Sequence, residues 1–98
     1  MELERDVEQY LVRSVRSAGG RCEKFIPDYR AGWPDRIVLL PGGVSAWVEL
    51  KRPRGGRLSP QQRHAHKVLR GLGQRVAVVW TKEDVDRLIA ELFAAART

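Results

Sequence analysis

The stretch GWPDRIVLLPGGVSAWVELK, residues 32–51, decides the fold of this chain. It holds two segments rich in apolar and β-branched residues, 35–40 and 44–51, on either side of a Pro-Gly-Gly turn sequence at 41–43. Two such runs joined by a short loop with glycine are typical of an antiparallel β-hairpin. A hairpin that turns at 41–43 places Asp35, at the start of its first strand, opposite the end of its second strand.

Helix and strand patterns continue on both sides of the hairpin. Apolar residues at near-helical spacing predict an opening helix, which Gly19-Gly20 ends. Ser59 and Gln62 have the spacing of a capping box, and Thr81 caps a last helix. The predicted elements are a helix over 3–17, a strand over 22–26, hairpin strands over 35–40 and 44–51, a helix from 59 to about 71–73, a strand over 76–80, and a helix after 81.

The order α-β-β-β-α-β-α indicates an α/β fold, a mixed β-sheet flanked by helices, in a single domain over residues 1–98. The β-α-β unit predicts that strand 76–80 runs parallel to strand 44–51. Because 76–80 is a continuous apolar run, we expect it to be covered on both faces.

Composition narrows the setting and the partners. The net charge is +6, and the pI is about 10.2. The single cysteine, the absence of zinc-type Cys/His spacing and the lack of a leader or membrane segment favour a soluble, cytoplasmic protein that binds no membrane. Residues 51–70 hold seven Lys or Arg residues and no acid, which favours contact with nucleic acid over a merely solvated helix face. The expected DNA contacts within it are Arg52, Arg54, Arg57, Arg63 and Lys67.

The strongest chemical pattern lies where the hairpin strands start and finish. Side chains alternate between the two faces of a strand, so Glu49 and Lys51 share one face. Asp35 joins them through the hairpin. Two carboxylates and the backbone carbonyl of Leu50 suit Mg²⁺ or Mn²⁺, and a nearby lysine suits hydrolysis of a phosphodiester. Taken alone, a Glu-x-Lys pair is usually a solvated strand face, and the conjunction with Asp35 makes the difference.

Several segments together carry a resemblance to a known family. They are Gly32-x-Pro34-Asp35-Arg36, Leu40-Pro41-Gly42-Gly43, Val48-Glu49-Leu50-Lys51, Leu58-Ser59-Pro60-x-Gln62 and Leu69-Arg70-x-Leu72-Gly73, along with the opening helix. This combination resembles the VRR-NUC (virus-type replication-repair nuclease) family of the PD-(D/E)xK superfamily, in its short stand-alone phage or prophage form. The resemblance implies a restriction-endonuclease-like core.

The resemblance also implies roles for individual residues. Asp35 and Glu49 would bind the metal, and Lys51 would be the catalytic lysine. A glutamate of the opening helix would join them; Glu8 is the better match and Glu4 the fallback. Gln62 would lie near the centre, although its spacing from Ser59 also fits a helix cap, so both interpretations stay open.

The implied activity is that of an Mg²⁺- or Mn²⁺-dependent endodeoxyribonuclease in a bacterial or phage-infected cell. It would be selective for branched DNA such as four-way (Holliday) junctions and would act as a homodimer. The alternatives are a nuclease for flaps or other duplex DNA, and a DNA-binding module without activity. Trp33 is expected to cap the core, with base stacking as the alternative, and His64 and His66 to lie on the surface or contact phosphate.

Overall fold

The structure is a computed structural model that describes residues 2–26 and 32–97. Seven elements follow one another in the order that the sequence predicts, which confirms the α/β fold class. Their bounds differ from the predicted ones by one or two residues at most ends of the strands and helices. The elements are α1 (Glu4–Ser17), β1 (Arg21–Lys24), β2 (Arg36–Leu40), β3 (Val44–Leu50), α2 (Pro60–Gly71), β4 (Val76–Val79) and α3 (Lys82–Ala96).

The four strands form one mixed sheet in the order β1-β2-β3-β4. β1 pairs with β2 and β2 with β3 in antiparallel fashion, whereas β3 and β4 are parallel. The predicted hairpin and the predicted parallel pair are therefore confirmed. In the hairpin, Arg36 faces Val48, so Asp35 and Glu49 are the next positions outward on the two strands.

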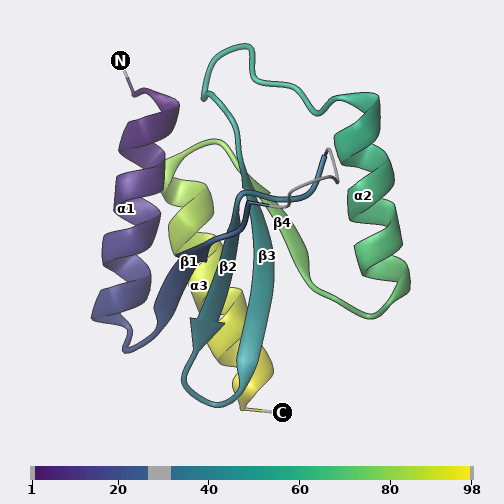
Figure 1. Ribbon diagram of the computed structural model, residues 1–98. Coiled ribbons are helices and arrows are strands. Elements are labelled where there is room, and N and C mark those ends of the chain that lie inside the picture. Colours follow the sequence, from purple (N-terminus) through teal and green to yellow (C-terminus); the bar gives the residue numbers. More distant parts are fainter. Residues whose placement is uncertain (1, 27–31, 98) are drawn as a thin grey trace.

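The two faces of the sheet are covered differently. α1 and α3 pack together against one face, and α2 lies on the other side of the sheet, near β4 (Figure 1). The core lies between the sheet and the α1–α3 pair. Its buried side chains include Val7, Leu11 and Val15 of α1 and Val44, Ala46, Val48 and Leu50 of β3.

α2 begins with the capping box that the sequence predicts. The Ser59 hydroxyl accepts a hydrogen bond from the Gln62 backbone N–H at 3.1 Å, and the Gln62 side-chain oxygen accepts one from the Ser59 N–H at 2.9 Å. Pro60 occupies the first turn, where its missing N–H is of no consequence. These local bonds start the helix at one defined residue, which fixes the face that it turns toward the sheet.

β4 departs from the expectation of cover on both faces. It is an edge strand of this sheet, and within it only Val79 is buried, while Val76, Ala77 and Val78 are partly exposed. Few contacts join α2 to β4, so that face of the strand stays partly open. An apolar run predicts burial only where another element lies close enough to cover it.

Candidate active site

Asp35 is fixed at the entrance to β2 by bonds to both neighbouring strands. Its backbone carbonyl accepts a hydrogen bond from the N–H of Phe25 at 2.9 Å. Its carboxylate oxygen Oδ2 accepts one from the N–H of Leu50 at 2.8 Å. The preceding Pro34 is buried and restricts the backbone. The hairpin thus brings Asp35 to the end of β3, as its register predicts.

Glu49 is an almost fully buried acid, with 1% of its surface exposed. Gln62 Nε2 donates to its Oε2 at 3.3 Å, and His66 Nε2 lies 3.3 Å from its Oε1. Burial, followed by the hydrogen bond and charge of the Asp35 carboxyl, raises the pKa of Glu49 to about 8, against an opposing effect of Lys51. Asp35 and Glu49 therefore form a close carboxyl pair.

Lys51 is held beside this pair by the backbone on both sides of it. Its N–H donates to the Val79 carbonyl at 3.0 Å, which continues the β3–β4 pairing. The next loop folds back at Gly56, where an added Cβ would lie 3.0 Å from the Lys51 Cβ and 2.5 Å from the Arg52 oxygen. Trp80 Nε1 donates to the Gly56 carbonyl at 3.1 Å and holds the loop there.

Gly32 joins the Gly-x-Pro-Asp segment to the start of α2. Its φ is +88°, and an added Cβ would lie 2.5 Å from the Gln61 carbonyl oxygen and 2.9 Å from the Gln62 nitrogen. Only glycine permits both this conformation and this approach. The contact sets the distance between the loop that carries Asp35 and the helix that carries Gln62.

The Gln62 side chain makes one contact that fits each of the two interpretations that its spacing left open. The oxygen completes the helix cap with Ser59, and the nitrogen donates to Glu49. A glutamine amide has one acceptor and two donors, so the two contacts do not compete.

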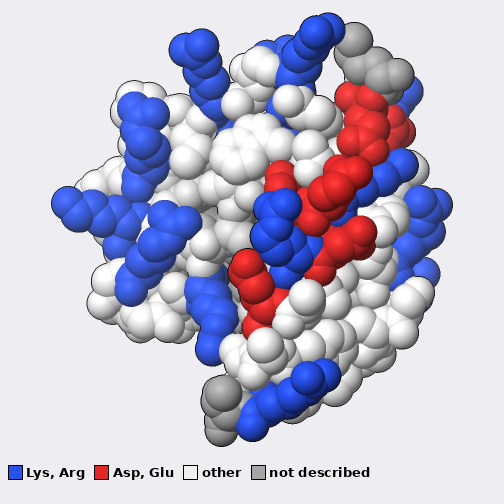
Figure 2. All heavy atoms as spheres, turned by 180° about the vertical axis from the view of Figure 1, so that it is seen from behind, with Lys and Arg blue, Asp and Glu red and all other residues white. Residues whose placement is uncertain are grey.

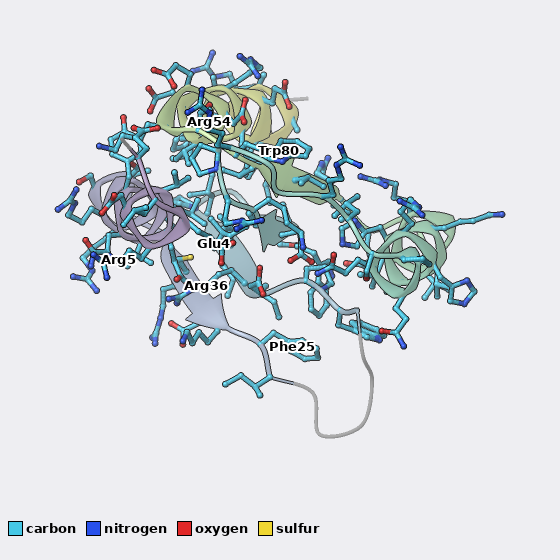
Figure 3. The ribbon with its side chains drawn as sticks, turned by 90° about the horizontal axis from the view of Figure 1, so that it is seen from above. Glu4, Arg5, Phe25, Arg36, Arg54 and Trp80 are labelled. Atoms are coloured by element: carbon cyan, nitrogen blue, oxygen red, sulfur yellow. The ribbon has the colours of Figure 1, made fainter. Side chains whose placement is uncertain are left out.

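The two candidate glutamates of α1 lie in different surroundings. Glu8 Oε2 accepts a hydrogen bond from Arg36 Nε at 3.0 Å, and Arg36 also donates to the Cys22 carbonyl. Glu4 has no such partner among the described residues, and its charge contributes to the raised pKa of Glu49. Figure 3 shows Glu4 and Arg36 directed into the region between α1 and the sheet, whereas Arg5 points outward.

His66 corrects one of the predictions. The sequence interpretation placed it at the surface, but only 1% of it is exposed, while His64 is exposed as expected. Burial, then Arg70 and Lys51, lowers its pKa. The spacing held the signal: His66 follows Gln62 by four residues, so both lie on one face of α2.

An aromatic cluster covers the sheet near the carboxyl pair. The ring of Trp47 lies 4.9 Å from that of Phe25 and 5.5 Å from that of Trp33, with edge-to-face geometry in both cases. Trp47 Nε1 also donates to the Gln74 side chain at 3.3 Å. Trp33 thus packs on other rings, and Phe25 is a member that the sequence interpretation missed, because its partners come from distant segments.

The donor chemistry of the carboxyl pair fits a hard divalent cation. Within the described residues, no group of three or more His, Cys, Asp or Glu side chains has metal-binding geometry. Mg²⁺ and Mn²⁺ need fewer, since they bind through one or two carboxylates and keep several waters. Each Glu49 oxygen has one side-chain nitrogen 3.3 Å away, and a carboxylate oxygen has a further lone pair for a metal.

Exposed basic side chains lie on the two segments that adjoin this pair, the loop after β3 and helix α2. The residues of the predicted DNA-contacting set are all exposed: Arg52, Arg54, Arg57, Arg63 and Lys67. Figure 2 shows Lys and Arg side chains gathered over α2, whereas Asp and Glu gather over α3 and the start of α1. Arg52 and Arg54 also line a hollow against the N-terminus of α1, together with Glu4.

In the part of the chain that the structure describes, no helix is both long and apolar enough to cross a bilayer.

Comparisons with known proteins agree with the resemblance. The chain is 42% identical over 76 residues to "Putative nuclease p44" of Acyrthosiphon pisum secondary endosymbiont phage 1, a match that covers 78% of this chain and 81% of the relative. A solved structure described as a VRR_NUC domain superposes with a TM-score of 0.83 at 34% identity, covering 89% of this chain and 94% of that one. No family model matches the sequence.

Proposed function

Because this chain belongs to the VRR-NUC family, we propose that it is a nuclease that hydrolyses phosphodiester bonds of DNA with Mg²⁺ or Mn²⁺. One observation carries the proposal. The hairpin sets Asp35 and Glu49 side by side at the end of β3, with the Glu49 pKa raised to about 8 and Lys51 just after the last residue of the strand. A buried acid beside a second carboxyl group destabilises a fold, so a purely structural role does not account for Glu49.

The metal would be held by Asp35, Glu49 and the backbone carbonyl of Leu50. When bound, it polarises a phosphoryl oxygen and lowers the pKa of a water molecule. For the acidic residue of α1 we propose Glu4 in place of Glu8. Glu4 acts electrostatically on Glu49, whereas the Glu8 carboxylate is paired with Arg36.

Lys51 and Gln62 complete the proposed machinery. Lys51 lies close enough to Glu49 to oppose the rise in its pKa, and it would orient the attacking water or stabilise negative charge on the phosphoryl group. Gln62 holds Glu49 in place through its amide nitrogen. In the reaction, a water oxygen forms a bond to phosphorus and loses a proton to solvent. The bond from phosphorus to one ester oxygen breaks, and that departing oxygen takes up a proton from solvent to become a hydroxyl group.

We further propose that the substrate is branched DNA such as a four-way (Holliday) junction, cut by a homodimer in the cytoplasm of a bacterial or phage-infected cell. The exposed basic side chains of residues 52–67 support contact with phosphates on more than one duplex arm. A single domain of this size offers little surface for reading bases, which favours recognition of DNA shape over sequence.

The test is cleavage of a labelled four-way junction beside flap and linear duplex DNA, with Mg²⁺, Mn²⁺ or EDTA. We expect paired cuts near the branch point that need a metal and disappear in Asp35→Ala and Lys51→Ala. Arg16→Ala, at the exposed end of α1, is the matched control and keeps full activity.

Other outcomes would redirect the proposal. Cutting of flap or linear DNA alone, or full cutting by a protein that stays monomeric on the junction, would remove the junction specificity. Salt-sensitive binding without cleavage under any metal would leave a DNA-binding module.

A further inference from the structure

We propose that His66 is a positioning residue, whose Nε2–H fixes the Glu49 carboxylate in the orientation that the centre requires. The inference deepens the proposed function, since it takes Glu49 as a metal ligand. His66 Nε2 lies 3.3 Å from Glu49 Oε1, and both side chains are 1% exposed. The contact is therefore shielded from water, where a hydrogen bond is stronger than at the surface.

His66 and Gln62 act on the same carboxylate from successive turns of α2. Gln62 Nε2 contacts Oε2 and His66 Nε2 contacts Oε1, so each oxygen has a donor of its own. Two contacts on two oxygens fix the rotation of the carboxylate plane, which one contact leaves free. Donors that orient a ligand in this way typically change metal affinity strongly when they are lost.

The other ring nitrogen of His66 supports this assignment. If Nε2 carries the proton that it donates, a neutral ring leaves Nδ1 as a bare acceptor. His66 Nδ1 is buried and finds no hydrogen-bond partner among residues 2–26 and 32–97. Burying an unpaired polar atom destabilises a fold, so packing alone would favour an apolar residue at this position. The contact of Nε2 with Glu49 explains why a histidine, and not an apolar residue, occupies this position.

Three substitutions separate this role from packing. Leucine fills the space without a donor. The side-chain nitrogen of glutamine can take the place of Nε2, whereas that of asparagine lies near Nδ1. The full chain is titrated with Mn²⁺ by calorimetry in the absence of DNA, and metal-free thermal unfolding is followed in parallel. We expect His66→Leu and His66→Asn to bind Mn²⁺ about 10- to 100-fold more weakly, and His66→Gln to stay within a few-fold of the wild type.

Thermal unfolding distinguishes a structural role of His66 from a positioning role, because the two predict opposite shifts of the melting temperature. A structural role predicts a lower melting temperature for His66→Leu, whereas the unpaired Nδ1 predicts one at or above that of the wild type. If His66→Leu does not fold, the glutamine and asparagine variants decide the matter, since both are polar and differ in the place of the nitrogen. Mn²⁺ affinity that is unchanged in His66→Leu, or equal in the glutamine and asparagine variants, overturns the proposal.

A second readout keeps this inference separate from the proposed function. The ring nitrogen shifts of His66 are measured by NMR on the metal-free protein above about pH 8, where Glu49 is a carboxylate, and they report which nitrogen carries the proton. We expect the proton on Nε2, and a proton on Nδ1 overturns the proposal whatever the metal does. A wild type that binds no Mn²⁺, while Nε2 is protonated and shifts in Glu49→Gln, would refute the metal in the proposed function and leave His66 as the group that orients Glu49.

Discussion

The two faces of β3 are made from alternate residues of one strand, yet the buried side chains on them differ in polarity. Val44, Ala46 and Val48 face α1 and α3 and form a core without polar atoms in their side chains. On the other face, Glu49 is as buried as Val48, but it is an acid held by a glutamine and a histidine of α2. Val48 and Glu49 are equally buried, so the difference between them lies in chemistry: Val48 stabilises the fold, whereas Glu49 is an acid whose charged form the fold alone does not favour.

Substitution of Glu49, with substitution of its neighbour Val48 as the control, tests whether the two faces of β3 have separate roles. Glu49→Gln keeps the size and the acceptor oxygen but removes the negative charge. If Glu49 binds the metal, the loss of several kcal/mol of transition-state stabilisation should lower cleavage by about a thousandfold or more. Single-turnover cleavage of the preferred DNA measures it, with Val48→Ala as the control on the opposite face. Comparable cleavage by the two variants would contradict the division of labour.

A pH titration of metal-free stability tests the same charge without any substrate. The Glu49 pKa is raised from 4.5 to about 8, so the folded protein keeps a proton that the unfolded chain releases within this range. The stability from this proton is complete below about pH 4.5 and is lost as the pH rises to about 8. We expect a loss of about 2–4 kcal/mol over that range, measured by urea unfolding in EDTA.

The control for this titration is Glu49→Gln. The lowered pKa of His66 gives a slope of the opposite sign, because there the unfolded chain binds the extra proton. The difference between the wild type and Glu49→Gln isolates the carboxyl. If both proteins show the same slope, the raised pKa is wrong.

Val48→Ala tests the apolar face. Val48 is fully buried in the core, so removal of two methyl groups should lower the free energy of unfolding by about 2 kcal/mol. Cleavage per folded molecule should stay within a few-fold of the wild type, because Asp35 is held by hydrogen bonds from the backbone of Phe25 and Leu50 that this change leaves in place. Urea unfolding and single-turnover cleavage together provide the measurement. A large loss of activity at full folding would show that the two faces are coupled.

The smallest expected effect lies outside both faces, on the exposed Arg57. If Arg57 contacts a phosphate, Arg57→Ala should weaken DNA binding a few-fold and reduce the slope of log affinity against log salt by about 1. Fluorescence anisotropy over a range of salt concentrations measures this slope. Arg16→Ala is the matched control, and an equal slope in the two variants would exclude Arg57 from the contact surface.

The sequence predicts the elements and the carboxyl pair because both depend on local rules. Strand alternation puts Glu49 and Lys51 on one face, and the length of the turn sets Asp35 opposite Glu49. The rest depends on how separate elements are rotated against each other. Glu4 and Glu8 are about one turn apart on α1, and periodicity does not say which one comes near the end of β3.

The same limit applies to the residues that the sequence interpretation missed. The burial of His66 follows from the rotation of α2 about its axis, and the incomplete cover of β4 follows from how far α2 lies from it. The contact of Phe25 with Trp47 joins segments more than twenty residues apart. Motif spacing carries no information about the contact of Phe25 with Trp47, whereas the place of Gln62 in its capping box could be tested against helix geometry alone.

The two contacts of Gln62 have a consequence for sequence variation at that position. A capping box accepts glutamate as readily as glutamine at its last position, so helix formation by itself would tolerate either amino acid there. Beside Glu49, a glutamate would bring a third carboxylate to the pair and has no N–H to donate when ionised. Helix formation thus permits either glutamine or glutamate at position 62, whereas the neighbouring Glu49 permits glutamine alone.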